Sequence, residues 1–165
     1  MHFFCVQRPI YGDHFDIKIL SILQEDNLLP QRDIGEKIGL SAAAVQRRIK
    51  RMRKAELIQK DTIILDREKI GQPITLIVEV ELENEKINLI DEAKSIFTNT
   101  PEVQQCYYIT GDSDFILIIL VSSMQEYEAL TRRIFFSNKN VKQFKTSVTL
   151  NIVKLGMNVP LPKAN

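Results

Sequence analysis

The chain has 165 residues, a length that fits one large or two small domains. Hydrophobic residues at 44% and charged residues at 26% are ordinary for a folded protein, which excludes disorder of the whole chain. The longest apolar run, residues 115–121, is too short to span a bilayer, and Cys5 and Cys106 form neither a disulfide framework nor a zinc pattern. We therefore expect no membrane helix, metal site or cofactor, and a reducing cytoplasmic compartment, because the start is a poor secretory signal.

The formal net charge of only +1 hides an uneven distribution. Residues 1–60 carry 11 Lys and Arg against 7 Asp and Glu, whereas residues 61–165 carry 11 against 14. A basic front half and a mildly acidic rear half indicate two domains with different partners.

The front half has the pattern of three short helices. Residues 1–12 show no periodicity and are interpreted as an N-terminal extension. One helix follows Asp13 as its N-cap, a second ends at Gly39, and a third starts after Ser41 as its N-cap. Because the last two helices are joined by a short turn that contains glycine, residues 13–60 are predicted to form a helix-turn-helix domain.

The third predicted helix is strongly cationic. Val45, Ile49 and Met52 form one apolar stripe, and between Ala42 and Ala55 there are six Lys or Arg and no acid. A merely solvated face would mix signs to gain ion pairs, so this pattern favours a polyanion as partner. The small residues after Ser41 would let the helix enter a DNA major groove tip first.

The candidate DNA-binding residues divide by role. Gln46 and Arg47 are predicted to contact base edges, and Ser41 a phosphate at the helix N-terminus. Arg48 lies closer to the apolar stripe and could instead pair with an acid of the first helix. The full predicted set is Ser41, Ala43, Gln46, Arg47, Lys50, Arg51 and Lys54, the last three cations being candidates for phosphates.

The rear half alternates between strand and helix patterns. Residues 61–72 are predicted to be a linker strand and a helical turn, and residues 73–165 a second domain. In that domain the predicted order is β-α-β-β-α-β, a ferredoxin-like arrangement. Its predicted segments are a strand at residues 74–82, a helix around 90–97, strands at 103–110 and 115–121, a helix after Ser123, and a strand at 141–153.

Helices cover only one face of such a sheet, so the other face must be solvated or covered by a second copy. Residues 116–121 are apolar at both alternating positions, which indicates burial on both faces. The sequence therefore predicts a homodimer formed through the sheet.

Four motifs occur in order along the chain and resemble the Lrp/AsnC, or feast/famine, family of transcriptional regulators. They are Asp13-x-x-Asp16-x-x-Ile19-Leu20-x-x-Leu23-Gln24-x-Asp26, Leu40-Ser41-x-x-x-Val45-x-x-Arg48-Ile49-Lys50-Arg51-Met52, the turn Thr110-Gly111-Asp112-Ser113-Asp114-Phe115, and Val141-x-x-x-x-Thr146-Ser147. The resemblance covers about residues 13–155. It implies an α+β protein: a winged or plain helix-turn-helix joined to a ferredoxin-like βαββαβ effector domain.

The resemblance also implies a function and an assembly. Members bind double-stranded DNA, dimerise through the effector sheet, often form an octamer of four dimers, and bind small amino acids at the contact between dimers. The implied effector residues here are Thr110, Gly111, Asp112, Asp114, Thr146 and Ser147. Without the resemblance, Asp112 and Asp114 would be read as turn residues. Leucine or methionine is the expected effector, because the surrounding strands are apolar.

The chain departs from the family pattern after the predicted recognition helix. The family usually has glycine there, and this chain has Glu56. If the position needs a left-handed backbone, glutamate costs on the order of 1 kcal/mol relative to glycine.

Two other functions remain open from the sequence. Some relatives of this architecture are similar to sirohaem decarboxylases, but this chain has only His2 and His14 and no recognisable catalytic arrangement, so no catalytic residue is predicted. A ligand sensor that acts through protein partners is the second alternative. It differs from a DNA-binding regulator in that it would lack a salt-dependent affinity for DNA.

Overall fold

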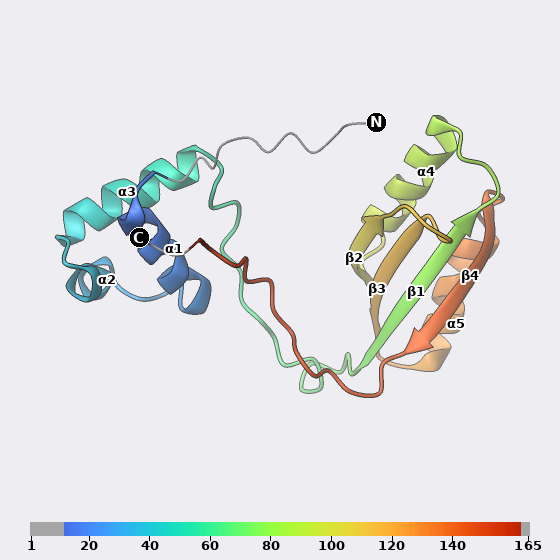
Figure 1. Ribbon diagram of the computed structural model, residues 1–165. Helices are drawn as coiled ribbons and strands as arrows, with labels where there is room; N and C mark the ends of the chain where they lie inside the picture. Colours follow the sequence, from blue (N-terminus) through green and yellow to red (C-terminus); the bar gives the residue numbers. More distant parts are fainter. Residues whose placement is uncertain (1–11, 163–165) are drawn as a thin grey trace. The chain divides into compact units, whose positions relative to one another are not determined.

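A computed structural model describes residues 12–162 and divides the chain into two compact units. Of the described residues, those up to Ile63 and those from Gly156 to Pro162 form the first unit, and Ile64–Leu155 form the second (Figure 1). The division falls inside the predicted linker at residues 61–72. The predicted N-terminal extension lies outside the described residues except for Gly12.

The first unit contains α1 (His14–Glu25), α2 (Gln31–Ile38) and α3 (Ala42–Lys54), as the sequence predicts. The Asp13 side chain accepts hydrogen bonds from the backbone N–H groups of Phe15 and Asp16, and Ser41 Oγ accepts one from Ala44 at 3.2 Å. Gly39 ends α2 in a left-handed conformation with φ 77°. The three helices enclose one apolar core, whose fully or nearly buried members are Ile19, Leu20, Ile34, Val45, Ile49 and Met52.

The end of α3 confirms the need for a left-handed residue. Glu56 has φ 57°, and its N–H bonds the carbonyl of Arg53 at 3.0 Å. The N–H of Leu57 bonds the carbonyl of Met52 at 3.0 Å, which completes a Schellman motif. Among the described residues no strand forms between α3 and β1, so the linker strand predicted within residues 61–72 is not present, and residues 67–71 form turns.

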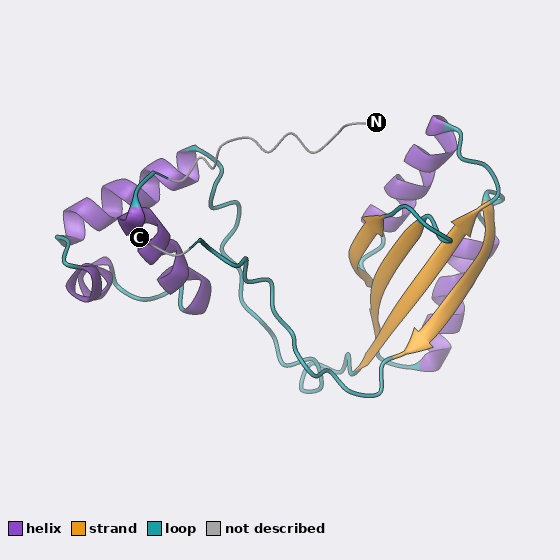
Figure 2. Ribbon diagram, in the orientation of Figure 1, coloured by secondary structure: helices purple, strands orange, loops and turns teal. Residues whose placement is uncertain are grey.

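The second unit contains a four-stranded antiparallel sheet in the order β2-β3-β1-β4. Its helices lie on one face of the sheet (Figure 2), and the predicted β-α-β-β-α-β order is confirmed. The elements are β1 (Ile74–Leu82), α4 (Ile87–Thr98), β2 (Val103–Tyr108), β3 (Phe115–Val121), α5 (Met124–Thr131), the π-helical turn η1 (Arg132–Phe136) and β4 (Val141–Val148).

The core of this unit lies between the sheet and its helices. Phe97 packs edge-on against both Phe115 and Phe135, with ring centroids 5.3 and 6.1 Å apart. Along β3 buried residues alternate with partly exposed ones, and the partly exposed positions lie on the face that the helices leave open. This open face carries Ile77, Ile116, Ile118 and Leu120, and Ile77 is 40% exposed.

Several boundaries differ from the prediction, and β2 ends at Tyr108 rather than at residue 110. The last strand ends at Val148 and not at residue 153, because its neighbour β1 begins only at Ile74, and the N–H of Thr149 makes a last bond to Thr75 at 3.0 Å. The residues from Gly156 on belong with the first unit, although the sequence assigned residues 73–165 to one domain. This proline-containing tail has no periodicity that indicates where it packs.

Candidate nucleic-acid interface

The outer surface of α3 carries the predicted DNA-binding residues. Val45, Ile49 and Met52 are buried in the unit, which turns the cationic side of the helix toward solvent. All seven predicted residues are exposed: Ser41, Ala43, Gln46, Arg47, Lys50, Arg51 and Lys54. The helix therefore presents positive charge along its length and only small side chains at its N-terminal turn.

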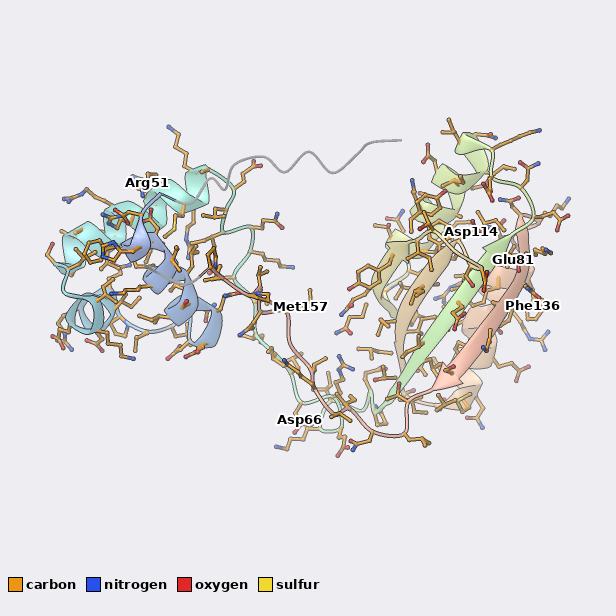
Figure 3. All side chains as sticks on the ribbon, in the orientation of Figure 1. Arg51, Asp66, Glu81, Asp114, Phe136 and Met157 are labelled. Carbon is orange, nitrogen blue, oxygen red and sulfur yellow. The ribbon has the colours of Figure 1, made fainter. Side chains whose placement is uncertain are left out.

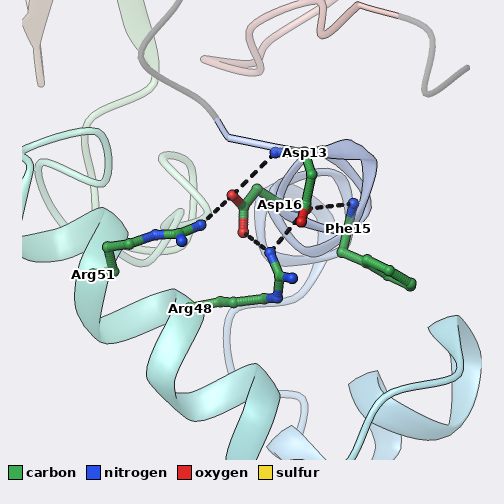
Figure 4. Close-up of polar contacts among 5 residues, drawn as sticks. All are labelled: Asp13, Phe15, Asp16, Arg48 and Arg51. Carbon is green, nitrogen blue, oxygen red and sulfur yellow. Dashed lines mark hydrogen bonds and ion pairs between the residues drawn. The ribbon is translucent and has the colours of Figure 1, made fainter.

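A fully buried carboxylate, that of Asp16 on α1, holds α3 in place (Figure 4). Arg48 Nη1 lies 2.9 Å from Asp16 Oδ1 and 2.8 Å from Asp13 Oδ1. The guanidinium of Arg51 pairs with the other oxygen of Asp16, and that of Arg48 also lies 5.4 Å from the centre of the Phe15 ring. The expectation that Arg48 could pair with an acid of the first helix is confirmed.

The pKa values in this network favour its ionised form. The hydrogen bond from Arg48 holds the pKa of the Asp13 carboxyl below its ordinary value. The hydrogen bonds to Asp13 and then Asp16 raise the pKa of Arg48 above its ordinary value. Both groups are ionised at neutral pH, and the two shifts are the consequence of the ion pairs that join α3 to α1.

Arg51 therefore differs from the other predicted phosphate contacts. Its side chain is 60% exposed, yet one of its nitrogens is engaged by Asp16. Arg47, Arg48 and Arg51 also line a hollow beside Leu40 and Ala44 at the N-terminal half of α3. Guanidinium groups are donors that suit anionic oxygens, although those of Arg48 and Arg51 are already paired with Asp16.

The sequence analysis missed the role of Asp16. Asp16 was named there only as a member of the first motif, and its pair with Arg51 was not predicted. A signal was present, because Asp16 precedes Ile19, Leu20 and Leu23 by three, four and seven residues and so shares their apolar face. A carboxylate on an apolar face needs a cation or several donors when it is buried.

The predicted effector turn joins β2 to β3, and the structure gives Asp114 a structural role there (Figure 3). Asp114 Oδ2 accepts a hydrogen bond from the N–H of Leu82 at 2.7 Å, and the Asp114 N–H bonds the carbonyl of Val80 at 2.9 Å. These bonds tie the turn to the end of β1. Thr110, Gly111 and Asp112 are exposed, and Gly111 has φ 139°, a conformation that favours glycine.

The two predicted effector residues of β4 lie apart from that turn within one chain. The hydroxyl of Thr146 bonds that of Tyr127 in the helix layer, and burial raises the pKa of Tyr127. Ser147 pairs with Ile77 of β1, one position along the strand from Thr146 and therefore on the opposite face. The six residues are thus not gathered into one pocket of a single chain.

Among the residues that the structure describes, no group of three or more His, Cys, Asp or Glu side chains could hold a metal ion. In the same part of the chain, no helix combines the length and the apolar character that crossing a membrane requires.

The fold and the site define a protein with an N-terminal helix-turn-helix and a ferredoxin-like second unit. Residues 13–53 match the AsnC-type helix-turn-helix domain, and residues 75–159 match the Lrp/AsnC ligand binding domain. The chain belongs to the Lrp/AsnC family of transcriptional regulators, and the resemblance seen in its sequence is confirmed.

Individual relatives agree with this assignment. The chain is 43% identical to an HTH-type transcriptional regulator of Sinorhizobium fredii over 90% of this chain and 88% of that protein. An AsnC family transcriptional regulator from Agrobacterium tumefaciens superposes with a TM-score of 0.86 at 28% identity, covering 90% of this chain and 97% of that one. A Neisseria meningitidis transcriptional regulator, solved in complex with L-Met, gives a TM-score of 0.85 at 23% identity and coverages of 91% and 97%, which shows a common fold.

Proposed function

We propose that this regulator reads a specific DNA sequence by placing α3 in the major groove. The single observation that supports this most is the surface of α3, which is exposed, cationic and free of acids while its apolar stripe is buried. The ion pairs of Asp16 with Arg48 and Arg51 hold the helix rigidly on its domain. A preorganised cationic helix loses little conformational entropy when it binds a polyanion.

Each exposed residue then has a role that its chemistry suits. Gln46 can donate to and accept from an adenine edge, and Arg47 can make a bidentate contact to guanine. Ala43 keeps the N-terminal turn slim, so that it can approach the bases. Lys50 and Lys54 contact phosphates, and the helix N-terminus at Ser41 faces another phosphate. Arg51 holds α3 to Asp16 and offers its remaining donors to the backbone.

The acting form is a homodimer formed through the open face of the sheet. Ile116, Ile118 and Leu120 are only partly buried there in a single chain, and burying them on a second copy would remove apolar area from water. Two recognition helices would then reach successive segments of the major groove. Four such dimers would close into the octamer that the family resemblance implies.

A small amino acid, leucine or methionine, is the proposed effector. Because the Asp114 carboxylate already accepts from Leu82, Asp112 is the freer partner for the ligand ammonium group, with Thr110 and Gly111 beside it. The L-Met complex of the structural neighbour from Neisseria meningitidis supports this class of ligand. Because Thr146 and Ser147 lie apart from the turn within one chain, a site that joins all six residues would need more than one subunit. Its occupancy would change the arrangement of dimers and so the DNA geometry they prefer.

The test is fluorescence anisotropy of the purified full chain on a pool of genomic DNA fragments over a salt series. We expect tight binding to a subset of fragments and a steep loss of affinity with salt. The double variant Arg47→Ala/Lys50→Ala should lose fragment selectivity, and its salt slope should fall by about one for the phosphate contact of Lys50.

The matched control removes the same charge from the second unit. Arg132→Ala/Lys139→Ala changes two exposed cations far along the sequence from α3 and should bind like the original chain. Weak and unselective binding that is equal in all three proteins would overturn the proposal. That result would favour one of the two alternative functions, a sirohaem-decarboxylase-like enzyme or a ligand sensor that acts through protein partners.

A further inference from the structure

The last described residues of the chain, Met157–Pro162, lie against the helix-turn-helix unit and are here called the C-terminal segment. Asn158, Val159, Leu161 and Pro162 line one side of an open groove. Its other walls are the residues Ile17, Lys18, Ser21, Ile22, Gln24 and Glu25 of α1 with Lys37 and Ile38 of α2. The groove therefore joins two parts of the chain that are far apart in sequence.

Polar pairing between Gln24 and Val159 anchors the C-terminal segment. The Gln24 carboxamide accepts a hydrogen bond from the Val159 N–H at 2.6 Å and donates one to the Val159 carbonyl at 3.1 Å. One side chain thus satisfies both backbone groups of a residue 135 positions away. A neighbouring β-strand satisfies backbone groups in the same way, so the contact recognises an extended peptide rather than a particular side chain.

An apolar contact follows two residues later. Leu161 is half-buried and packs against the core of the first unit. The side chains of Ile17, Ile22 and Ile38 give the groove an apolar floor, while Lys18 and Lys37 stand among its polar lining. The backbone of Val159 and the side chain of Leu161 therefore form a two-point anchor, of which the first is polar and the second apolar.

The sequence of the C-terminal segment is suited to this role. Val159 and Leu161 each precede a proline, Pro160 and Pro162. A residue before proline is restricted to extended or polyproline II conformations, so both anchors are held extended before they bind. Less conformational entropy is then lost when the C-terminal segment docks.

We propose that the surface of α1 and α2 around Gln24 is a peptide-docking surface, and that its occupant is the C-terminal segment of the same chain, which forms one wall of the groove. The segment is joined to β4 by residues 149–156 only. Docking within one chain is intramolecular, with an effective concentration on the order of millimolar, so even a contact that is weak between separate molecules would be occupied. The helix-turn-helix unit is thereby fastened to the chain at two places, through α3 into the linker and through this groove to the residues after β4.

The docking surface is separate from the candidate nucleic-acid interface. The groove is lined from α1, α2 and the C-terminal segment, whereas the exposed cations lie on α3. A docked segment therefore leaves Arg47 and Lys50 accessible. The proposal does not depend on DNA or effector binding, and its tests need neither.

The first test is hydrogen exchange of α1 in the full chain and in a chain that ends at Leu155. We expect amides of residues 17–25 to exchange faster in the shortened chain, on the order of tenfold, because the docked segment protects them. Gln24→Ala should show the same change, although alanine favours the helix more than glutamine does. Leu150→Ser is the matched control, since Leu150 is 99% exposed, and it should exchange like the original chain.

A peptide of residues 156–165 added to the shortened chain should restore the protection of α1. Its affinity should fall about fivefold or more when Gln24→Ala is present, because both hydrogen bonds to Val159 are lost. Unchanged exchange in the shortened chain, together with no binding of the peptide, would overturn the proposal.

Crosslinking distinguishes the same chain from a second copy. In a Cys5→Ser/Cys106→Ser background, Ser21→Cys and Asn158→Cys place one thiol on α1 and one on the C-terminal segment, both at residues that line the groove. A short bismaleimide should join them within one chain and give a product of single-chain mass. A product of twice that mass would show that the segment docks on another copy, which contradicts the assignment of its occupant.

Discussion

Asp16 is fully buried beneath α3, and its Oδ1 lies 2.9 Å from Nη1 of Arg48. This relationship ties the DNA-binding helix to the first helix of its domain. Burying a carboxylate without partners would be costly, so the two arginines are required by the fold as much as by any ligand. The arginines of α3 therefore divide into those that hold the helix and those that are free to bind.

Replacing the buried carboxylate tests this division. Asp16→Asn leaves hydrogen-bonding capacity but removes the charge that Arg48 and Arg51 share, and we expect a loss of about 2 kcal/mol in the free energy of unfolding. Urea unfolding followed by circular dichroism measures it. Glu36→Gln, which weakens only an exposed pair with Arg32, should leave the midpoint unchanged. Equal midpoints for Asp16→Asn and the original chain would contradict the structural role.

Two adjacent arginines of α3 should differ in their roles, Arg48 contributing to stability and Arg47 to DNA affinity. Arg48→Ala removes the contacts to Asp13 and Asp16 and should lower the free energy of unfolding by about 1–3 kcal/mol. Arg47→Ala, at an exposed position, should leave stability within about 0.5 kcal/mol and instead weaken DNA binding. Urea unfolding measures the stability of both variants, and fluorescence anisotropy measures their DNA affinity. If Arg47→Ala destabilised the fold as much as Arg48→Ala, the assignment would fail.

Glu56 is a second place where the structure makes a quantitative prediction. Its φ of 57° strains any side chain that carries a Cβ atom. Glu56→Gly should therefore raise the free energy of unfolding by about 1 kcal/mol, as seen in the urea midpoint. Ala55→Gly is the matched control, because Ala55 has φ −85° and no strain to relieve, so it should stabilise nothing. A destabilised Glu56→Gly variant would argue against the strain.

Local sequence patterns were enough to predict most of the fold. The caps at Asp13 and Ser41, the stop at Gly39, the alternation at the end of β1 and the apolar run of β3 act over a few residues, so the elements that they define follow from the sequence. The end of β4 did not, because it depends on where β1 begins, a feature of the sheet and not of the strand itself.

The candidate site was predictable to a smaller extent. The exposed cations of α3 follow from helical periodicity, and their exposure is confirmed. The pair between Asp16 and Arg51 joins residues 35 positions apart, and the docking of Val159 on Gln24 joins residues 135 apart. Periodicity places Asp16 on the apolar face of α1, but it does not name the partner in either contact, because only the packed structure decides which side chains meet.

Acid should weaken the anchoring of α3. The pKa of Asp13 is lowered in the folded protein, chiefly by the hydrogen bond from Arg48, so its contribution to stability is complete above its unfolded pKa of about 4. That contribution is lost as the pH falls through the lower folded pKa. Asp13→Asn should therefore show a shallower decline of the urea midpoint below about pH 4 than the original chain. Identical profiles would mean that the Asp13 pKa is not shifted by folding.

The two aspartates of the β2–β3 turn should behave differently. The Asp114 carboxylate accepts from the Leu82 N–H at 2.7 Å, so Asp114→Ala should cost about 1–3 kcal/mol in the free energy of unfolding. Asp112 is exposed, and Asp112→Ala should leave stability unchanged while it weakens the binding of leucine or methionine.

Isothermal titration calorimetry with both amino acids, beside urea unfolding of both variants, measures the two effects. Ser113→Ala in the same turn serves as control, because it removes no charge. Loss of binding in Asp114→Ala alone, at unchanged stability, would reverse the roles assigned to the two carboxylates. If Asp112→Ala binds the amino acid fully, the ligand ammonium group does not bind at this turn. Glu79, which lies beside Ile116 on the open face of the sheet, would then be the next carboxylate to test.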